Sequence, residues 1–381
     1  MCKRNCKQIF LKLIAAGLWG DRNADMQIDE AVDWDYIYQL AQEQSVQGLV
    51  LQGIEAVREK GGQLQGSTLV SSDLLLQWIG DVQIIEQQNK EMNAFIAVLI
   101  EKLQRHGIYA LLVKGQGIAQ CYERPLWRVS GDVDLLLNEK NYCKAKDYLC
   151  QKASSIDEEN KYQHLGMIID GWNVEIHGTL RSGLLKRMDA IVDEVQYNTF
   201  NKGNTRVWRN DKTDVFLPNP DDDIIFVFTH IIKHFFHEGI GLRQICDWCK
   251  LVYAYRDSLN YGLLESRIKE AGLMSEWKAF AACAVEYLGM PMDAMPLFDE
   301  KDSHSNRLKR KADKICEFIL MAGNFGHNRD FSYYGKKSLI KKKINSFTRH
   351  TCDSLKKLAI FPLDTMTVWN RMLIKGIQAI I

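Results

Sequence analysis

Apolar residues recur with helical spacing through the first hundred residues. Between Asp35 and Ala56 they fall about every 3.6 residues, which predicts one helix there. A second pattern of the same period continues to about Arg105, and the polar residues Ser71 to Asp73 can cap its start. The glycine-rich stretch 61–67 predicts the loop between the two helices.

The pattern changes after Gly107, where short apolar runs of strand length alternate with turns. The Asp-Gly pair at positions 170 and 171 separates two such runs, which predicts a β-hairpin. The predicted elements are a strand at 108–113, a glycine turn at 114–117, a small helix at 118–122, a strand at 132–137, a helix at 139–151 that opens after Asn138, hairpin strands at 164–170 and 173–177, and further strand at 205–217 with a turn at Asn210 and Asp211.

Helical spacing returns from Pro220, which with the acidic residues after it favours a helix start. The order of elements predicts an α+β fold with a small mixed sheet between N- and C-terminal helical regions. Helices are predicted at 221–237, 241–255, 260–271, 275–288 and 305–321. The predicted parts are an N-terminal helical region at 1–106, an α/β core at 107–219, a C-terminal helical domain at 220–335, and a tail at 336–381 that is first basic and then amphipathic.

Composition narrows the class of protein. The chain has 381 residues and a formal net charge of +1, whereas dedicated nucleic-acid binders are usually strongly basic. No apolar run approaches the roughly 18 residues of a membrane span. Lys12 interrupts the first apolar segment, so a signal peptide is not expected. Ten scattered cysteines are typical of reduced thiols in a cytoplasm, and Cys246 and Cys249 are expected to be buried helix residues.

Two carboxylates flank one apolar residue in the predicted strand at 132–137. Because residues two apart on a strand share a face, Asp132 and Asp134 are expected to project together, while Val133 points to the core. Like charges held this close repel one another unless a cation lies between them. Mg²⁺ is commonly bound by one or two carboxylates together with substrate phosphates. The pair therefore predicts a magnesium site for a nucleoside triphosphate (NTP), such as ATP.

Three further features support this prediction. The turn that contains Gly115 and Gly117 follows a strand and precedes a helix, so its N–H groups could bind phosphates. Lys114 and Arg128 are cations that could neutralise a triphosphate. Glu175 lies on a later strand, and three carboxylates from adjacent strands can hold two metal ions for phosphoryl displacement.

This combination resembles the polymerase-beta nucleotidyltransferase superfamily, and within it a bacterial family of uncharacterised nucleotidyltransferases. The resemblance lies in Lys114-Gly115, Tyr122, Arg128 and the run 131–137, followed by the Glu-x-His strand at 174–177 and the helical stretches 229–234 and 241–247. It implies a polymerase-beta-like core in which Asp132, Asp134 and Glu175 bind two Mg²⁺ ions. Glu175 would either coordinate the catalytic metal or take the proton from an acceptor hydroxyl.

Simpler interpretations exist for several of these residues. Lys114 and Arg128 could be ion-pair partners of the acids, and His177 could be a core histidine that Glu175 orients. Arg243 and Asp247 are four residues apart on a helix and could form an intrahelical pair. His230, His234 and His237 have spacing compatible with zinc, but lining of the nucleotide cleft is the favoured interpretation.

The sequence thus predicts a cytoplasmic, Mg²⁺-dependent nucleotidyltransferase with an unknown hydroxyl acceptor. Two alternatives stay open: a nucleotide-binding or scaffold protein without turnover, and a toxin-like nucleotidyltransferase that acts on RNA or protein. The basic cluster at 336–343 would suit RNA, but the near-neutral charge disfavours nucleic acid as a partner.

Overall fold

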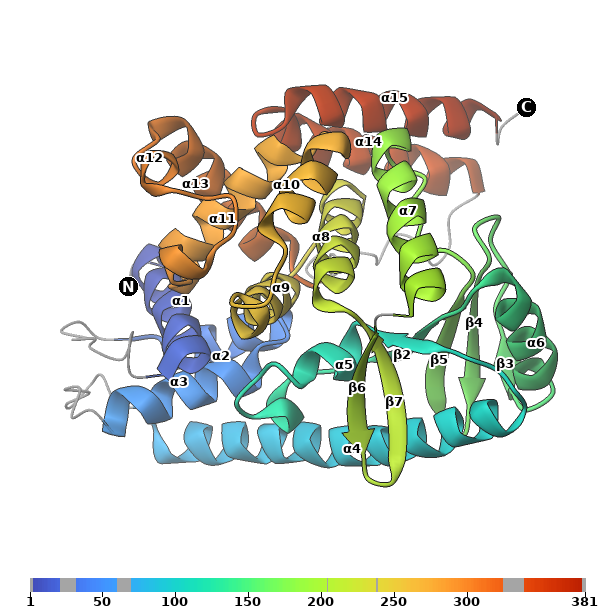
Figure 1. Cartoon of the computed structure of the whole chain (residues 1–381). Coiled ribbons are helices and arrows are strands. Elements are labelled where there is room, and N and C mark those ends of the chain that lie inside the picture. Colours follow the sequence, from blue (N-terminus) through green and yellow to red (C-terminus); the bar gives the residue numbers. More distant parts are fainter. Residues whose placement is uncertain are drawn as a thin grey trace.

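A small mixed sheet lies between helices from the two ends of the chain (Figure 1). The structure is a computed structural model that describes residues 3–20, 32–59, 70–203, 205–237, 239–324 and 339–378. The predicted α+β class is confirmed, and helices make up most of the described chain.

Four helices precede the sheet, at Lys3–Trp19 (α1), Trp34–Glu43 (α2), Gln47–Glu59 (α3) and Ser72–Arg105 (α4). Ser71 caps α4 as predicted, because its side chain accepts a hydrogen bond from the Leu74 N–H. The single helix predicted for 35–56 is wrong. The chain breaks at Ser45, whose φ is 55°, after Gln44, whose buried side chain donates to Ile319 O and accepts from Leu242 N. The loop predicted at 61–67 lies outside the described residues.

The sheet has the strand order β1-β2-β5-β4-β3. Its second strand is antiparallel to β1 and parallel to β5, which confirms a mixed sheet. Asp170 and Gly171 both have positive φ, as the two-residue hairpin turn between β4 and β5 requires. The strands are Leu111–Val113 (β1), Asp132–Leu136 (β2), Ser155–Ile156 (β3), His164–Ile169 (β4) and Trp172–His177 (β5).

Several predicted boundaries in this region shift. The first strand is confined to Leu111–Val113, and the short helix after it is Gly115–Ala119 (α5) instead of 118–122. Helix Glu139–Cys150 (α6) begins after its Asn138 cap as predicted. The remaining elements are a 3₁₀ turn at Pro125–Trp127 (η3), an unpredicted helix at Lys186–Lys202 (α7), and a separate hairpin of Thr205–Asn210 (β6) and Thr213–Pro218 (β7) that lies across α4 (Figure 1).

Helices fill the rest of the chain, and the five predicted between 221 and 321 are confirmed. Asn219 caps the first of them, which buries Phe228 against Trp248 and Trp277. Within the described residues, no helix is both long and apolar enough to cross a membrane. The helices are Pro220–Phe236 (α8), Leu242–Tyr255 (α9), Tyr261–Glu270 (α10), Met274–Leu288 (α11), Glu300–Ser303 (α12), Asn306–Ala322 (α13), Leu339–Leu358 (α14) and Pro362–Gln378 (α15), with a 3₁₀ turn at Met292–Ala294 (η4).

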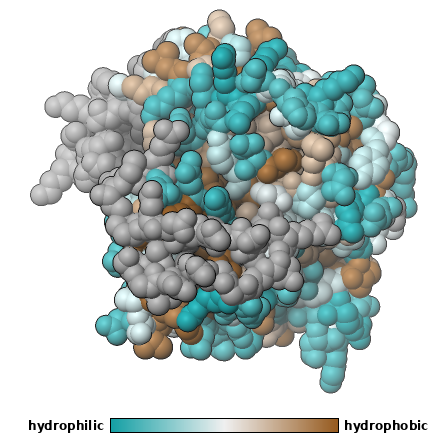
Figure 2. Space-filling model, turned by 90° about the vertical axis from the view of Figure 1, so that its left-hand side faces the viewer, coloured by the Kyte–Doolittle hydropathy of each residue, from teal (hydrophilic) through white to brown (hydrophobic). Residues whose placement is uncertain are grey.

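The predicted basic cluster at 336–343 lies outside the residues whose side chains are described. On the part of the surface coloured in Figure 2, hydrophilic and apolar residues are intermixed, as is usual for protein surfaces in contact with water.

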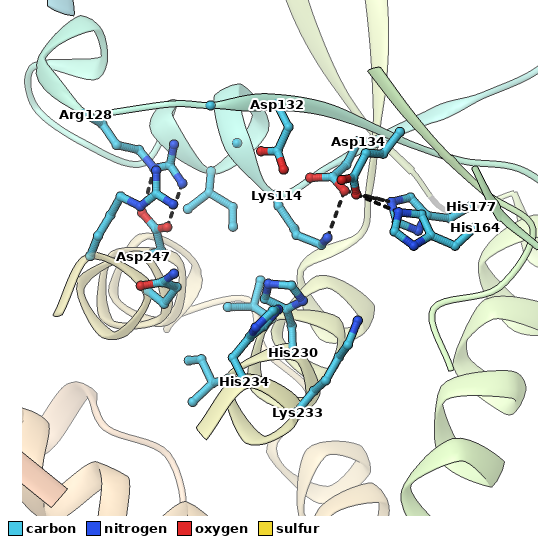
Figure 3. Close-up of a pocket in the computed structure, with 18 residues that line it drawn as sticks. Lys114, Arg128, Asp132, Asp134, His164, His177, His230, Lys233, His234 and Asp247 are labelled. Carbon is cyan, nitrogen blue, oxygen red and sulfur yellow. Dashed lines mark hydrogen bonds and ion pairs between the residues drawn. The ribbon is translucent and has the colours of Figure 1, made fainter. Parts of the chain in front are cut away.

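The two faces of the sheet have different roles. One face carries Val133, Leu135, Val174 and Ile176, which are buried in a core that α4 and α6 cover. Because side chains alternate along a strand, the residues between these apolar positions lie on the opposite face. That face is turned toward α8 and α9 and carries the predicted site (Figure 3).

Candidate active site

Three carboxylates meet on the polar face of the sheet. Asp132 and Asp134 share a face of β2, and Asp134 lies directly opposite Glu175 in the parallel register of β2 and β5. One carboxylate oxygen from each residue lies within 4.8 Å of the others. The three residues line a cavity of about 370 Å³ between the sheet and helices α8 and α9 (Figure 3). The structure thus brings together the acids that the sequence singled out.

Asp134 is the most deeply buried of the three, with 2% of its surface exposed. Lys114 Nζ lies 2.9 Å and His177 Nε2 lies 2.7 Å from its Oδ1 atom. Burial alone would raise the pKa of Asp134, but the Lys114 charge and the His177 hydrogen bond outweigh it and lower that pKa. Lys114 is therefore an ion-pair partner of an acid, as one interpretation of the sequence held.

His177 is a neutral donor to this carboxylate. Burial lowers the pKa of His177, and an ionised carboxylate can only accept hydrogen bonds, so Nε2 carries the proton that points at Asp134. The same His177 Nε2 atom lies farther from Glu175 Oε2, at 3.5 Å. His177 is thus a buried histidine that is oriented mainly by Asp134, whereas the sequence suggested Glu175.

Asp132 carries the uncompensated part of the negative charge. The Asp134 charge, with burial second, raises the pKa of Asp132 to about 6. A divalent cation among the three oxygens would relieve this repulsion, and carboxylate oxygens are the ligands that Mg²⁺ prefers. The donor set therefore fits a magnesium site.

His164 was not identified from the sequence, yet it contacts the site directly. Its Nε2 atom lies 2.9 Å from Glu175 Oε2, and its ring stacks on His177 with centroids 4.6 Å apart. Burial would raise the pKa of Glu175, but the His164 hydrogen bond together with the nearby His177 and Lys114 outweighs it, so that pKa is lowered. Asn160 Nδ2 lies 3.3 Å from the other ring nitrogen of His164. A second possible metal group, His164 with Glu175 and His177, shares Glu175 with the acid cluster.

Helix α8 forms the opposite wall of the cavity. His230, Lys233 and His234 project from it toward the sheet, and His237 lines an adjoining cavity (Figure 3). Burial, followed by the charge of Lys114, puts the pKa of His230 well below the usual range. His230 and His234 thus line the cavity, as the favoured interpretation of the sequence held, and the two possible metal groups found within the described residues include none of the α8 histidines.

The two glycines of the predicted phosphate turn have different surroundings. Gly115 lines the cavity and follows Lys114, which adopts a positive φ of 59° that is uncommon for a residue with a side chain. Gly117 faces the protein instead, since a Cβ atom there would lie 3.0 Å from Leu217 Cδ2. Packing against β7 therefore explains Gly117 without a ligand.

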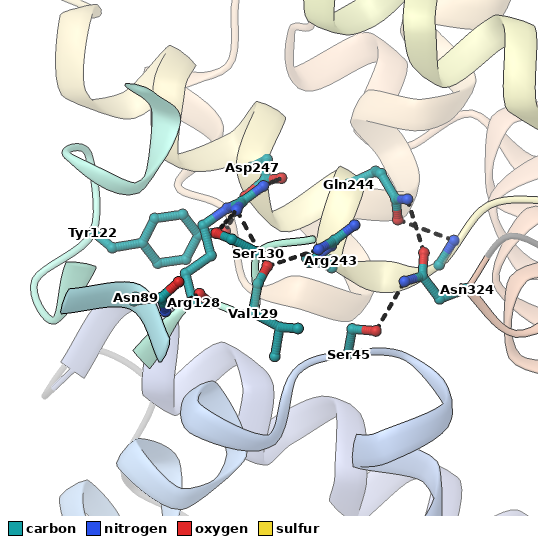
Figure 4. Close-up of polar contacts among 11 residues, drawn as sticks. Ser45, Asn89, Tyr122, Arg128, Val129, Ser130, Arg243, Gln244, Asp247 and Asn324 are labelled. Carbon is teal, nitrogen blue, oxygen red and sulfur yellow. Dashed lines mark hydrogen bonds and ion pairs between the residues drawn. The ribbon is translucent and has the colours of Figure 1, made fainter. Parts of the chain in front are cut away.

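Arg128 borders the cavity but is held by a carboxylate. Its Nε and Nη2 atoms each donate to Asp247 at 2.7 Å, and the Tyr122 hydroxyl donates to Asp247 at 2.8 Å (Figure 4). The predicted intrahelical pair of Arg243 and Asp247 is thus replaced by a bidentate pair between Arg128 and Asp247.

Arg243 is the second guanidinium at the cavity, and the sequence did not identify it as a site residue. One terminal nitrogen donates to Val129 O at 2.7 Å, while its Nε atom is buried without a hydrogen-bond partner among the described residues. Burial, followed by repulsion from Arg128, lowers the pKa of Arg243. A nearby Gln244–Asn324–Ser45 chain of hydrogen bonds joins α9 to the N-terminal helices (Figure 4).

Comparison with known protein families gave a match that covers most of the chain. A family model described as an uncharacterised nucleotidyltransferase matches residues 30–289, a range that contains all three acids. No curated protein and no solved structure matches the chain.

Proposed function

We propose, because the chain belongs to the uncharacterised nucleotidyltransferase family, that it transfers a nucleoside monophosphate from an NTP to an acceptor hydroxyl and releases pyrophosphate. The observation that carries this proposal is the convergence of Asp132, Asp134 and Glu175 at one cavity. The same proposal includes a polymerase-beta-like core at 107–219 with helical parts on either side of it. It also includes that the protein is bacterial and acts in the cytoplasm. The nine described cysteines are all free, which agrees with a reducing compartment.

The three acids would hold two Mg²⁺ ions in this proposal. When bound, Mg²⁺ would neutralise phosphate charge and favour the departure of pyrophosphate. Lys114 and the N–H groups at Gly115 would contact the phosphates from the sheet side, and Lys233 would do so from α8. Glu175, which His164 orients, would coordinate metal or accept the proton of the acceptor hydroxyl.

Labelled NTPs and Mg²⁺ test this function through pyrophosphate release and transfer of label. We expect the double variant Asp132→Asn with Asp134→Asn to lose on the order of 10³-fold in rate, because several kcal/mol of charge stabilisation depend on these carboxylates. Removal of Mg²⁺ with EDTA should have the same effect. Asp147→Asn, an exposed change on α6, serves as the matched control. Pyrophosphate release that survives the double substitution would contradict the assignment.

One observation favours a second function, which is NTP binding without turnover. Asp134 already has an ion pair with Lys114 and a hydrogen bond from His177, so a cavity that binds nucleotide without catalysing transfer is compatible with the same contacts. NTP binding with no pyrophosphate release for any acceptor would support this alternative. Incorporation of label into RNA or protein would support the toxin-like one.

A further inference from the structure

Two side cavities extend from the acid cluster over the same face of the sheet. The first, of about 300 Å³, lies beyond the end of β5 that carries His177, and the second, of about 390 Å³, lies over its Asn173 end. The register of β4 and β5 pairs His164 with His177 and Ile168 with Asn173, so the two cavities lie toward opposite ends of these strands. Glu175 stands between those ends, in the same row as Asp134.

The first space, here called the basic cavity, is lined by basic side chains without an acidic one among its described lining residues. Those lining residues include four lysines or arginines and four histidines. Lys114 is paired with Asp134, and Arg181 with Asp193, both outside this lining. Lys161 lies over the Tyr162 ring with its Nζ atom 5.0 Å from the centroid, and Lys233 faces the cavity from α8.

The second space, here called the acidic cavity, has the opposite character. Asp132, Asp157 and Glu175 line it, and Arg243 is the one basic residue in its described lining. Gly166 makes room for Asp157, because a Cβ atom at that position would lie 2.4 Å from Asp157 Oδ2. The position of Asp157 in this cavity therefore depends on the glycine opposite it.

Displacement at phosphorus places the attacking and leaving oxygens on opposite sides of the reacting atom. This inference rests on the proposed nucleotidyl transfer. We propose that pyrophosphate leaves into the basic cavity and that the acceptor enters through the acidic cavity. The acceptor is accordingly a hydroxyl compound that carries no phosphate or carboxylate group, and an amine-bearing compound is preferred.

The proposed reaction exchanges one bond at the α-phosphorus for another and transfers one proton to a group at the site. The acceptor oxygen forms a bond to the α-phosphorus while the bond from that phosphorus to the oxygen bridging to the β-phosphorus breaks. The bonding electron pair leaves with pyrophosphate, and the hydroxyl proton passes to the Glu175 carboxylate, which lines the acidic cavity.

Charge makes this orientation the favourable one. Pyrophosphate gains charge-assisted hydrogen bonds from lysine and arginine, whereas it would be repelled by the carboxylates of the acidic cavity. An anionic acceptor would meet the same repulsion at Asp157, while an ammonium group would be attracted there. Nucleic acid, with a phosphate on every nucleotide, is disfavoured as acceptor on this ground.

Binding of Mg²⁺-pyrophosphate to the full chain, measured by calorimetry, tests the orientation. We expect Lys161→Gln in the basic cavity to weaken binding about fivefold to tenfold, and the exposed control Lys152→Gln to leave it unchanged. If Lys161→Gln has no effect and Asp157→Asn tightens binding, pyrophosphate occupies the acidic cavity. That result overturns the inference and leaves nucleotidyl transfer intact. A protein that binds neither NTP nor pyrophosphate refutes the proposed function itself.

A panel of acceptors tests the substrate class. Glucosamine, glucose and glucose 6-phosphate share one scaffold and differ in charge, and stimulation of pyrophosphate release should rank them in that order. Asp157→Asn should reduce the advantage of glucosamine over glucose, whereas Glu158→Gln, an exposed change at the next residue, should not. Preference for glucose 6-phosphate would overturn the inference, and the pyrophosphate measurement decides the orientation even when no member of the panel reacts.

Discussion

Two guanidinium groups border the cavity, and they are held in different ways. Arg128 is almost fully buried in its bidentate pair with Asp247, whereas Arg243 donates to a backbone carbonyl and keeps its Nε atom without a partner among the described residues. The ion pair orients the segment that leads into Asp132. The phosphate-binding role that the sequence suggested for Arg128 is therefore better suited to Arg243, which we propose as the guanidinium that contacts substrate.

Conservative substitutions separate these two roles. Arg128→Lys should destabilise the protein by about 3 kcal/mol, because one ammonium group cannot replace a buried bidentate pair. Arg243→Lys should change stability little and lower kcat/KM about tenfold or more. Urea unfolding and steady-state kinetics measure the two effects, and exposed Arg105→Lys is the control. Equal losses of stability in both variants would contradict the division of roles.

The acids could be predicted from the sequence because a two-residue period places Asp132 and Asp134 on one face without any knowledge of the fold. His164 could not, since its contact with Glu175 depends on the register of the hairpin. The pairing of Asp247 could not be predicted either, because its partner Arg128 lies 119 residues earlier and the nearer Arg243 offered a plausible local pair.

At the scale of elements, helices α1 and α3 cross with their backbones in close contact. A Cβ atom at Gly53 would lie 1.9 Å from Leu13 O, and one at Gly17 would lie 2.0 Å from Leu49 O. These glycines are required because any side chain would force the two helices apart.

This crossing makes a prediction about stability. Gly53→Ala should lower the free energy of unfolding by about 3 kcal/mol, since the helices must separate and their packing is lost. Gly80→Ala on α4 is the control, because nothing lies within 4 Å of its added Cβ atom. There alanine should stabilise the helix by about 0.5–1 kcal/mol. Urea unfolding of both variants measures the difference between their free energies of unfolding. Equal unfolding midpoints would contradict the prediction, because they would mean that the two helices accommodate the added methyl group without loss of packing.

Elements with clear caps and apolar stripes were the predictable ones, as for α4 and α8. The break between α2 and α3 was missed because the apolar period continues through it, while a buried tertiary contact of Gln44 ends the helix. Helix α7 did carry a signal, since its buried residues Met188, Ile191, Val192 and Val195 have helical spacing.

At the scale of the whole molecule, the site is built from regions of the chain that were predicted as separate parts. The sheet supplies the acids, α8 and α9 supply the opposite wall, and the chain from Ser45 through Asn324 to Gln244 joins the N-terminal helices to that wall. The division at 106 and 219 stays a prediction. Asn89 of the first predicted part donates to Arg128 O of the second, and Arg128 pairs with Asp247 of the third, so all three parts contact one another beside the cavity.

The C-terminal helix α15 is attached to the rest of the molecule through buried acids. Arg187 of α7 donates to Asp364 of α15 at 2.5 Å, and Asp364 in turn hydrogen-bonds to Glu276 of α11. Burial, followed by the charge of Asp364, raises the pKa of Glu276 to about 8. At neutral pH the folded protein therefore keeps a proton on Glu276 that the unfolded chain releases.

The sign of the resulting pH dependence follows from this proton. Above the ordinary glutamate pKa of 4.5, unfolding releases the proton, so the contribution of Glu276 to stability is complete below that pH and is lost as pH rises toward about 8. Glu276→Gln retains a neutral hydrogen-bonding side chain and should remove this loss, gaining a few kcal/mol over wild type near pH 8 but not near pH 4.5. Urea unfolding of wild type and Glu276→Gln across this pH range gives the difference between their free energies of unfolding. The other titrating groups are the same in both proteins, so their contributions cancel in this difference. The exposed change Glu270→Gln is the control. Parallel profiles for wild type and Glu276→Gln would mean that Glu276 is ionised in the folded protein, and α15 would then have to be held against a buried pair of like charges.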